Sequence, residues 1–585
     1  MLKSLSVVAV LAVGGLFCCH LFTGLAYAVS SSAFAVTTPR NGATVSGKRY
    51  TFTVAGTSGS EWVNVAIYDA NNFYAAVSAN VTPSGGAWST TVNTNMLVLV
   101  NGRADIAVVA FSVPAGGSGG TSTSVNLSLV VGSLCSIRNT PYMPGPYGTG
   151  DCRRNEFAAA ANDFLNSIGI DFGGESTLAE YATLMNYIGV RNFRYGCEGG
   201  GTAAYALKLA RATNTKASWG LGSGWGHYSW ACTDDLAKNV IAPAKALADA
   251  GVLLALEGPN EPDNWNITYQ GQVGGGGDSD PAAPWLPVAE LQRDFYAAAK
   301  ADEALKSYPV WDESASGAEI ENVGLQFLTI PDGSGLVMPD GTQYADYANE
   351  HNYVLWPNAT APTDNSAWWA ADPLESPLGG TLASDYGTTW KYGYAGYNDA
   401  QLETLPRVTT ENGWESNIGG AENQGRILLN VLLSQFKRGY KYTFLYQLVD
   451  NEGGFANEFG LVRSNYSHKP AAVFIHNLTQ ILSDNRSLPT GRLKYKIPNE
   501  PETVHDLLLQ KSDGRFELIV WDDRPIGEAT DKVTVELGGI HHTVDIYDPT
   551  VGTTKVQTYN DVNSVQLTLT DHPLILEVAE EEWRN

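Results

Sequence analysis

Two glutamates stand where they could act as a pair. Glu261 closes the run LEGPNE (256–261), and Glu411 lies within TTENGW (409–414). A carboxylic acid that protonates a departing oxygen and a carboxylate that attacks the carbon are together sufficient to cleave a glycosidic bond. The pair therefore predicts acid–base and nucleophilic chemistry, provided that the fold brings both side chains into one cleft.

The elements that would position them alternate regularly. From 165 to 484, short apolar runs alternate with amphipathic stretches such as 178–188, 234–250 and 424–438, which is typical of βα units. We expect strands at 168–172, 190–195, 216–221, 252–257, 309–313, 347–353, 407–410 and 442–448. Eight such units predict a (β/α)8 TIM barrel. An open doubly wound sheet is the alternative, but the glycine-rich turn of nucleotide-binding sheets is missing after the first strand.

In a barrel the carboxyl ends of all strands meet at one mouth. Glu261 would follow the fourth strand and Glu411 would end the seventh, so the two would face one cleft from opposite sides. Arg194 ends the second expected strand, and His351 and Tyr353 end the sixth.

The Asn-Glu-Pro at 260–262, together with a second glutamate ending strand seven, resembles clan A glycoside hydrolases, which include families 5, 30, 39 and 79. The resemblance implies retention of configuration, with Glu261 as acid/base, Glu411 as nucleophile, and Asn260 on the sugar's 2-hydroxyl. It covers 165–585 in outline. The runs YQLVD (446–450), FGL (459–461) and KPA (469–471) are most similar to family 39, whereas strand eight lacks the tryptophan of many family 5 enzymes.

The same resemblance implies roles for three neighbours. Arg194 would hold the nucleophile ionised, Tyr353 would hydrogen-bond it, and His351 would tune or orient the catalytic pair. We also expect a less polar setting to raise the pKa of Glu261. Alternatives remain, since Arg194 could pair with another acid at a strand end and His351 could be a satisfied core histidine. Glu257 is interpreted as a structural residue of the barrel.

Aromatic residues after the strands are candidate platforms for sugar rings, because flat rings stack on the apolar faces of sugars. The candidates are Trp225, His227, Trp230, Trp265, Trp356 and Trp414. Each could equally serve loop packing. Trp265 and Trp414 are favoured because they lie close to the two glutamates in sequence.

The N-terminus predicts export. Lys3 precedes an apolar stretch at 6–25, and Ala26-Tyr27-Ala28 offers a cleavage site, so residues 1–28 read as a signal peptide. A membrane anchor is the alternative. We expect a secreted, extracellular or periplasmic protein without a membrane segment after cleavage.

Four cysteines remain after that cleavage, an even number that fits two disulfides in an exported chain. We expect Cys135–Cys152 and Cys197–Cys232, although four cysteines allow three connectivities. Their spacing is not that of a zinc site.

β-rich regions flank the barrel in the sequence. Residues 33–131 alternate apolar and polar side chains between Gly/Ser/Asn turns, and they resemble a bacterial immunoglobulin-like β-sandwich, here a spacer or a carbohydrate-binding module. Residues 132–164, rich in proline and glycine, would form a linker or collar. Residues 485–585 return to strands and predict a C-terminal β-sandwich.

The formal net charge of −25, with a pI near 4.7, disfavours nucleic acid as a partner and suits a neutral or cationic glycan. No metal or organic cofactor is expected, because two carboxylates supply the whole cycle. The sequence thus predicts a secreted, monomeric, retaining hydrolase of a β-linked glycan. A catalytically silent carbohydrate-binding or surface protein and a transglycosylase are the alternatives.

Overall fold

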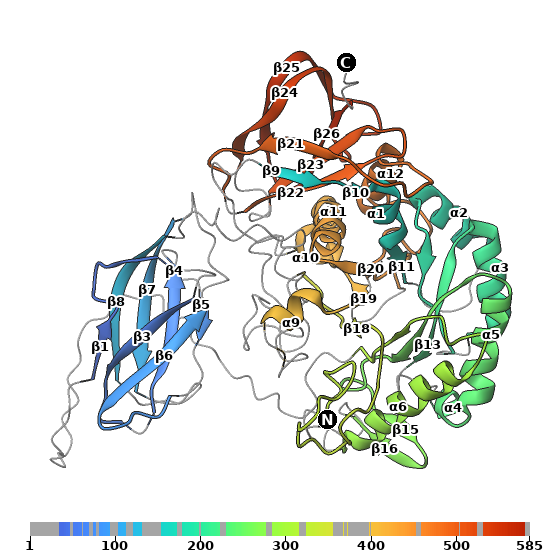
Figure 1. Ribbon diagram of the computed structural model, residues 1–585, viewed down its shortest axis with the longest axis horizontal. Helices are drawn as coiled ribbons and strands as arrows, with labels where there is room; N and C mark the ends of the chain where they lie inside the picture. Colours follow the sequence, from blue (N-terminus) through green and yellow to red (C-terminus); the bar gives the residue numbers. More distant parts are fainter. Residues whose placement is uncertain are drawn as a thin grey trace. The chain divides into compact units, whose positions relative to one another are not determined.

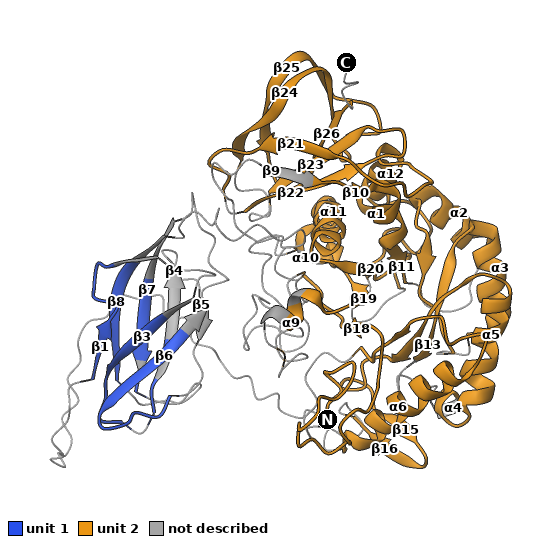
Figure 2. Cartoon of the chain, in the orientation of Figure 1, with its two compact units in different colours: residues 1–132 blue, residues 133–585 orange. Residues whose placement is uncertain are grey.

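The computed structural model divides into two compact units, residues 1–132 and 133–585 (Figure 2). It describes residues 34–46, 51–60, 62–69, 74–77, 81–93, 103–112, 121–130, 154–171, 178–197, 201–222, 230–275, 283–314, 323–354, 367, 371, 397, 399–451, 458–501, 503–522 and 530–579. The predicted signal peptide lies outside these ranges. Within them, no helix combines the length and the apolar character needed to cross a membrane.

Eight parallel strands form a barrel in the second unit (Figure 1). Each pairs in parallel with its neighbour, the last pairs with the first, and a parallel bridge from Trp311 to Tyr347 joins the fifth strand to the sixth. The predicted TIM barrel is confirmed. In chain order its strands are β11 (Ile168–Ile170), β12 (Asn192–Phe193), β13 (Lys216–Gly222), β14 (Leu253–Pro259), β17 (Val310–Trp311), β18 (Ala348–Asn349), β19 (Arg407–Asn412) and β20 (Tyr440–Leu445).

Apolar side chains of the strands pack in two groups. Most strand residues join the helices in one large core. A separate cluster gathers Leu254, Ala255, Trp311, Val408 and Phe444 from four of the strands. The absent side chain of Gly169 makes room there, because a Cβ on it would come within 2.4 Å of the Phe444 ring. Such close packing fixes where each strand ends, and hence where the residues of the mouth lie.

Helices follow the strands and cover the outside of the barrel, as α2, α3 and α5 do beside β11–β13 (Figure 1). The predicted helix 234–250 begins instead as a π-helical segment, η3, ahead of α5. Pro243 explains the change, because it has no N–H to continue the α-helical ladder. The helices are α1 (Ala161–Ser167), α2 (Leu178–Ile188), α3 (Ala203–Thr213), α4 (Trp230–Thr233), η3 (Ala237–Ile241), α5 (Ala242–Asp249), α6 (Leu286–Ala301), α9 (Asp399–Thr404), α10 (Ser416–Gly419), α11 (Ala421–Lys437) and α12 (Pro470–Ile481); a hairpin of β15 (Ile267–Tyr269) and β16 (Gln272–Gly274) follows β14.

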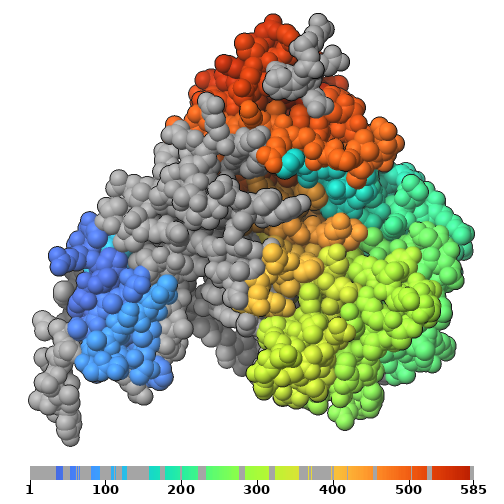
Figure 3. Space-filling model, viewed as in Figure 1, coloured from blue at the N-terminus to red at the C-terminus, as the bar shows by residue number. Residues whose placement is uncertain are grey.

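The C-terminal strands form an eight-stranded sheet that recruits residues from the predicted linker. The strand order is β10-β22-β23-β26-β24-β21-β9, and β25 pairs with β24. Figure 3 shows the teal surface at the start of the barrel against the orange surface of this sheet. The strands are β9 (Arg154–Phe157), β10 (Ala159–Ala160), β21 (Arg492–Lys496), β22 (Val504–Gln510), β23 (Phe516–Asp522), β24 (Asp531–Tyr547), β25 (Gln557–Leu569) and β26 (Leu574–Val578).

Helices α11 and α12 join the barrel to this sheet. Lys437 of α11 forms an ion pair with Asp506 of β22 at 2.5 Å. Asn477 of α12 donates a hydrogen bond to the carbonyl of Pro549 at 2.8 Å. The barrel and the sheet belong to one compact unit, and these polar contacts between them are buried or nearly so.

The first unit contains a three-stranded and a five-stranded sheet, ordered β1-β3-β6 and β2-β8-β7-β4-β5. Buried side chains come from both, for example Val54 and Trp88 from the first and Val108 and Leu127 from the second. The immunoglobulin-like and sandwich assignments of the two flanking regions stay predictions. The strands are β1 (Ala35–Thr38), β2 (Thr44–Ser46), β3 (Thr51–Thr57), β4 (Asn64–Asp69), β5 (Tyr74–Val77), β6 (Ala87–Asn93), β7 (Arg103–Phe111) and β8 (Ser122–Val130).

Candidate active site

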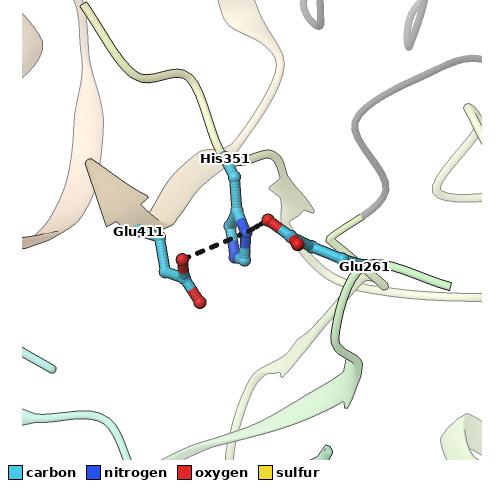
Figure 4. A group of neighbouring side chains, drawn as sticks. All are labelled: Glu261, His351 and Glu411. Atoms are coloured by element: carbon cyan, nitrogen blue, oxygen red, sulfur yellow. Dashed lines mark hydrogen bonds and ion pairs between the residues drawn. The ribbon is translucent and has the colours of Figure 1, made fainter. Parts of the chain in front are cut away.

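The two predicted glutamates meet at the mouth of the barrel. Glu261 follows β14 and Glu411 lies in β19, and both are buried, with exposed fractions of 6% and 9%. One carboxylate oxygen of each, and a ring nitrogen of His351, all lie within 4.8 Å of one another. His351 stands between the two carboxylates (Figure 4).

The backbone at Glu261 turns sharply to present its side chain. Its φ of +40° lies in the left-handed region, which costs a non-glycine residue on the order of 1–3 kcal/mol. Its carbonyl accepts hydrogen bonds from the backbone N–H groups of Asn264 and Trp265, at 3.0 and 2.8 Å. Its own N–H donates to the hydroxyl of Ser314, at 3.3 Å. These bonds hold the turn that ends strand β14 and keep the strained residue in place.

Both oxygens of Glu411 accept hydrogen bonds from buried donors. Nη1 of Arg194 donates to Oε1 at 2.5 Å, and the hydroxyl of Tyr353 donates to Oε2 at 2.7 Å. The ring of Tyr353 is held edge-on against Phe459 and Tyr446, with centroids 5.5 and 6.4 Å away. The carboxylate is therefore fixed in orientation on both sides.

Arg194 is shared among three carboxylates and one amide. Besides Glu411, its Nη1 contacts Asp171 Oδ2 at 3.1 Å, its Nε contacts Glu257 Oε1 at 2.8 Å, and its Nη2 contacts Asn260 Oδ1 at 2.5 Å. Only 11% of its side chain is exposed. The guanidinium of Arg194, which follows β12, thus links residues that follow or belong to three other barrel strands, β11, β14 and β19.

His351 is fully buried and connects the two carboxylates. Its Nδ1 lies 2.6 Å from Glu261 Oε1 and 3.6 Å from Glu411 Oε2, and its Nε2 lies 3.1 Å from the hydroxyl of Thr410. Burial favours the neutral ring, but the charge of Glu411 and the hydrogen bond with Glu261 outweigh it and raise the pKa of His351.

The expectation of a raised pKa for Glu261 is wrong. Burial does raise it, but the hydrogen bond with His351, the charge of that ring and the 3.1 Å bond from the Asn264 amide favour the carboxylate more. The pKa of Glu261 therefore lies below its ordinary value. The sequence predicted that Glu261 and His351 lie at the same mouth, but it did not indicate that they are 2.6 Å apart.

The other predicted residues divide into three groups. Asn260 is buried at the site, and no described residue accepts a hydrogen bond from its Nδ2. Trp265 is half-buried and lies one turn beyond Glu261. Trp414 does not fit the predicted role, because it is fully buried in the main core and has no face for a sugar ring. Trp225, His227 and Trp356 lie outside the described residues.

One predicted disulfide is confirmed. Cys197, after β12, is bonded to Cys232 of α4, with their Cα atoms 6.0 Å apart. The bond ties the loop that follows Arg194 to the loop region after β13. Cys135 and Cys152 lie outside the described residues.

Sequence reasoning missed Asp171 and undervalued Glu257. Asp171 directly follows β11, so the strand-end rule that selected Arg194 could have selected it too. Glu257 belongs to β14, two residues before that strand ends, and Glu261 follows the strand. The position of Glu257 near the carboxyl end of a barrel strand was the available signal for its contact with Arg194.

A second group of acids lies beside the site. Glu350, which precedes His351, is 5% exposed, and burial together with Glu313, Asp263 and Asp312 raises its pKa well above the ordinary value. This side of the mouth is acidic as well.

Comparison with known proteins returns solved glycoside hydrolases. No family model matches the chain, and no curated protein matches it. A family 39 glycoside hydrolase from Bacteroides cellulosilyticus WH2 is 13% identical, with a TM-score of 0.46, over 93% of this chain and 100% of that one. A family 30 subfamily 8 xylanase from Clostridium acetobutylicum is 12% identical, with a TM-score of 0.45, over 73% and 98%.

A β-glucuronidase from Ruminococcus gnavus is 15% identical, with a TM-score of 0.32, over 73% of this chain and 65% of that one. Families 39 and 30 are two of those that the sequence motifs resemble. Since the TM-scores are below 0.5 and the identities are low, the function proposed below rests on the geometry of the site and on the sequence, and not on these structures.

Proposed function

We propose that this protein hydrolyses β-linked O-glycosidic bonds of a poly- or oligosaccharide with retention, by double displacement, using Glu411 as nucleophile and Glu261 as acid/base. The observation that carries the proposal is the approach of their carboxylate oxygens to within 4.8 Å. Carboxyl groups about 5–5.5 Å apart suit direct attack on the sugar, whereas roughly 6.5–9.5 Å leaves room for the water of an inverting enzyme.

The assignment of roles follows from the partners of each carboxylate. Glu411 accepts from Arg194 and Tyr353, two donors that stabilise an ionised group and aim it. Glu261 shares a short hydrogen bond with a ring that can carry a proton, His351. Such a partner can exchange a proton with a group that must gain and lose one in each cycle, whereas fixed donors suit a nucleophile.

The cycle then balances in two steps. In the first, Glu411 attacks the anomeric carbon, the bond to the leaving oxygen breaks, and the proton of Glu261 moves to that oxygen. In the second, water attacks the same carbon, its proton moves to Glu261, and the bond to Glu411 breaks. In this proposal the amide of Asn260, which is buried at the site, donates to a hydroxyl of the sugar, and the half-buried Trp265 stacks beside it.

A neutral glycan fits this site better than a polymer of uronic acids. Among the described residues that contact either glutamate, Arg194 alone carries a fixed positive charge, and three carboxylates already surround it. A substrate carboxylate would add a further negative charge to a mouth where Glu350 and its neighbours are already acidic, and no other described residue that contacts either glutamate offers a fixed positive charge.

Export is part of the proposal. The lysine, apolar stretch and Ala-Tyr-Ala of residues 1–28 predict a cleaved signal, and a disulfide between Cys197 and Cys232 suits an oxidising compartment. We propose that the mature chain works as a monomer outside the cytoplasm, with its first unit as a spacer.

The test begins with a screen of β-glucans, mannans, xylans, galactans and a polyuronide, with the anomer of the first product resolved by NMR. Retention on a neutral glycan is the expected result. Release of the opposite anomer would contradict the nucleophile assignment, and preference for the polyuronide would contradict the charge argument. Binding without release of sugar would favour the silent carbohydrate-binding alternative, and products longer than the substrate the transglycosylase.

Chemical rescue then separates the roles. In Glu261→Ala, azide should intercept the glycosyl-enzyme and give a product of retained configuration. In Glu411→Ala, azide should attack the sugar directly and give the inverted product. Glu303→Gln, an exposed glutamate paired only with Lys306, is the matched control and should keep wild-type activity.

A further inference from the structure

Asp171 is a buried carboxylate of the site to which the proposed cycle gives no task. It follows β11, and 12% of its side chain is exposed. Its backbone is fixed on both sides by the end of β20, because its N–H donates to Leu445 at 2.9 Å and its carbonyl accepts from Leu448 at 2.8 Å. The carboxylate therefore has a fixed place relative to two strands.

Asp171 and the proposed nucleophile share one nitrogen. Nη1 of Arg194 contacts Asp171 Oδ2 at 3.1 Å and Glu411 Oε1 at 2.5 Å. A guanidinium carries its N–H groups in a rigid planar fork, so a terminal nitrogen has two hydrogens in fixed directions. An acceptor on one hydrogen fixes the direction of the other.

We propose that Asp171 is a positioning residue, which anchors one N–H of Arg194 Nη1 so that the other N–H of the same nitrogen is aimed at Glu411. The proposal rests on the function assigned to Glu411 above. The bonds of Arg194 to Glu257 and Asn260 hold the other edge of the guanidinium, and Asp171 holds the edge that faces the nucleophile.

The protonation of Asp171 determines how strongly it competes with Glu411 for that nitrogen. Burial, Glu411 and Glu257 raise the pKa of Asp171 to about 7, against the opposing effect of Arg194. Below that pH the neutral group still accepts a hydrogen bond through its carbonyl oxygen. Above it the carboxylate attracts the guanidinium more strongly, at the expense of Glu411, and the reaction should slow.

The described groups that face Asp171 come from four other strands. Arg194 follows β12, Glu257 belongs to β14, Glu411 belongs to β19, and Tyr446 follows β20. The pKa of Tyr446 is raised by burial and by the charges of Glu411 and Asp171, so its hydroxyl stays neutral throughout the relevant range. We therefore expect Asp171 to titrate near neutral pH while Tyr446 keeps its proton.

The test compares Asp171→Asn and Asp171→Ala with the wild type, using an aryl β-glycoside whose leaving group needs no protonation. Asparagine keeps an oxygen for Nη1, so its kcat at about pH 6 should stay within roughly threefold of wild type. Alanine keeps none, so its kcat should fall roughly 10- to 100-fold while KM changes by less than about threefold. Asp302→Asn, an aspartate paired with Lys245 away from the site, is the control and should match wild type.

The pH dependence of kcat/KM distinguishes positioning from a purely structural role, because loss of a structural residue would not change it. From about pH 6 to about pH 8, wild-type kcat/KM should fall roughly tenfold as Asp171 ionises, whereas Asp171→Asn should stay flat and exceed wild type at the higher pH. An identical fall in wild type and Asp171→Asn overturns the proposal, as does unchanged kcat in Asp171→Ala.

A crystal structure of Asp171→Ala separates this proposal from the hydrolase assignment. Arg194 should turn away so that Nη1 no longer contacts Glu411. If the contact persists at its present length, Asp171 does not position Arg194, whatever reaction the protein performs. If Arg194 turns but the wild type cleaves no glycoside, the positioning role stands and the proposed function fails.

Discussion

Replacing Tyr353 by phenylalanine removes a single hydroxyl group from the site. That hydroxyl donates to Glu411 Oε2 at 2.7 Å, and 3% of the residue is exposed. A hydrogen bond to a charged group contributes about 1.5–3 kcal/mol. Since about 1.4 kcal/mol corresponds to a tenfold change in rate, kcat/KM should fall roughly 10- to 150-fold. The phenylalanine ring keeps its contacts with Phe459 and Tyr446, so the melting temperature should change by only a few degrees.

The matched control for this variant is Tyr269→Phe. Tyr269 also donates its hydroxyl to a carboxylate, Asp294, at 2.8 Å, but it lies in the β15–β16 hairpin. Both variants lose one bond of the same type, so their stabilities should fall by similar amounts, whereas only Tyr353→Phe should lose kcat/KM. The assay is initial rates on the best substrate of the screen, together with thermal unfolding of both variants. Equal kcat/KM in the two variants would refute the reasoning that Tyr353 acts on the nucleophile.

Three further predictions follow from other contacts. Burial raises the pKa of Glu261 and His351 lowers it. His351→Asn should therefore move the alkaline limb of the kcat/KM profile to higher pH for substrates whose leaving group needs protonation. An alkaline limb that stays in place contradicts a proton shared between His351 and Glu261. Replacing both Cys197 and Cys232 by serine should lower the free energy of unfolding, measured with denaturant, by about 4 kcal/mol, since their 35-residue separation closes a sizeable loop. Equal stability of the wild type with and without reductant contradicts this. Burial lowers the pKa of His572, but Asp548 and Asp571 outweigh it and raise the pKa from 6.5 to about 9. The contribution of His572 to the free energy of unfolding, at most about 3 kcal/mol, should therefore be complete below about pH 6.5 and vanish as the pH rises through about 9. A difference in unfolding free energy between wild type and His572→Gln that does not change with pH contradicts this.

The barrel could be predicted because its strands are short apolar runs between amphipathic helices. The strand expected at 216–221 is observed at Lys216–Gly222, and the helix expected at 178–188 has those bounds. The fifth and sixth strands are shorter than expected, with two ladder residues each. Each apolar run is followed by buried acidic residues, and in the sixth strand also by His351, which make no strand pairing. Periodicity alone does not show where the strand pairing ends.

Strands β9 and β10 could not be predicted from local pattern. Residues 154–160 pair with β21 and β22, more than 300 positions later in the chain. These residues are strands because they pair with β21 and β22. The segment itself is too short and polar to indicate a strand. A linker was the natural reading of its composition, because non-local pairing leaves no periodicity in the segment.

Within the site, the strand-end rule succeeded where a strand's direction determines a side chain's place. It correctly placed Arg194, His351 and Tyr353 around the two glutamates. Sequence proximity was a poorer guide, because Trp414 follows Glu411 by three residues yet turns into the core, where its carbonyl accepts a hydrogen bond from Gln424 of α11. Once the chain has left the strand, the following helix determines where a side chain points.

The protonation of the site depends on the whole cluster and not on any one residue. Four carboxylates, those of Asp171, Glu257, Glu261 and Glu411, surround one guanidinium and one imidazole, and so many buried charges of one sign cannot all persist without protons. Near neutral pH a proton on Asp171 neutralises one of these carboxylates, and the proton between His351 and Glu261 offsets the charge of another.

The charge of the substrate should affect this second proton. A neutral sugar that displaces water from the mouth would increase the burial of Glu261 and move the proton between His351 and Glu261 toward the carboxylate, where the leaving oxygen needs it. A charged sugar acid would instead favour the protonated imidazole and hold the proton away from the leaving oxygen. Substrate charge would then affect the chemical step as well as binding, so a uronide should lose kcat in addition to affinity.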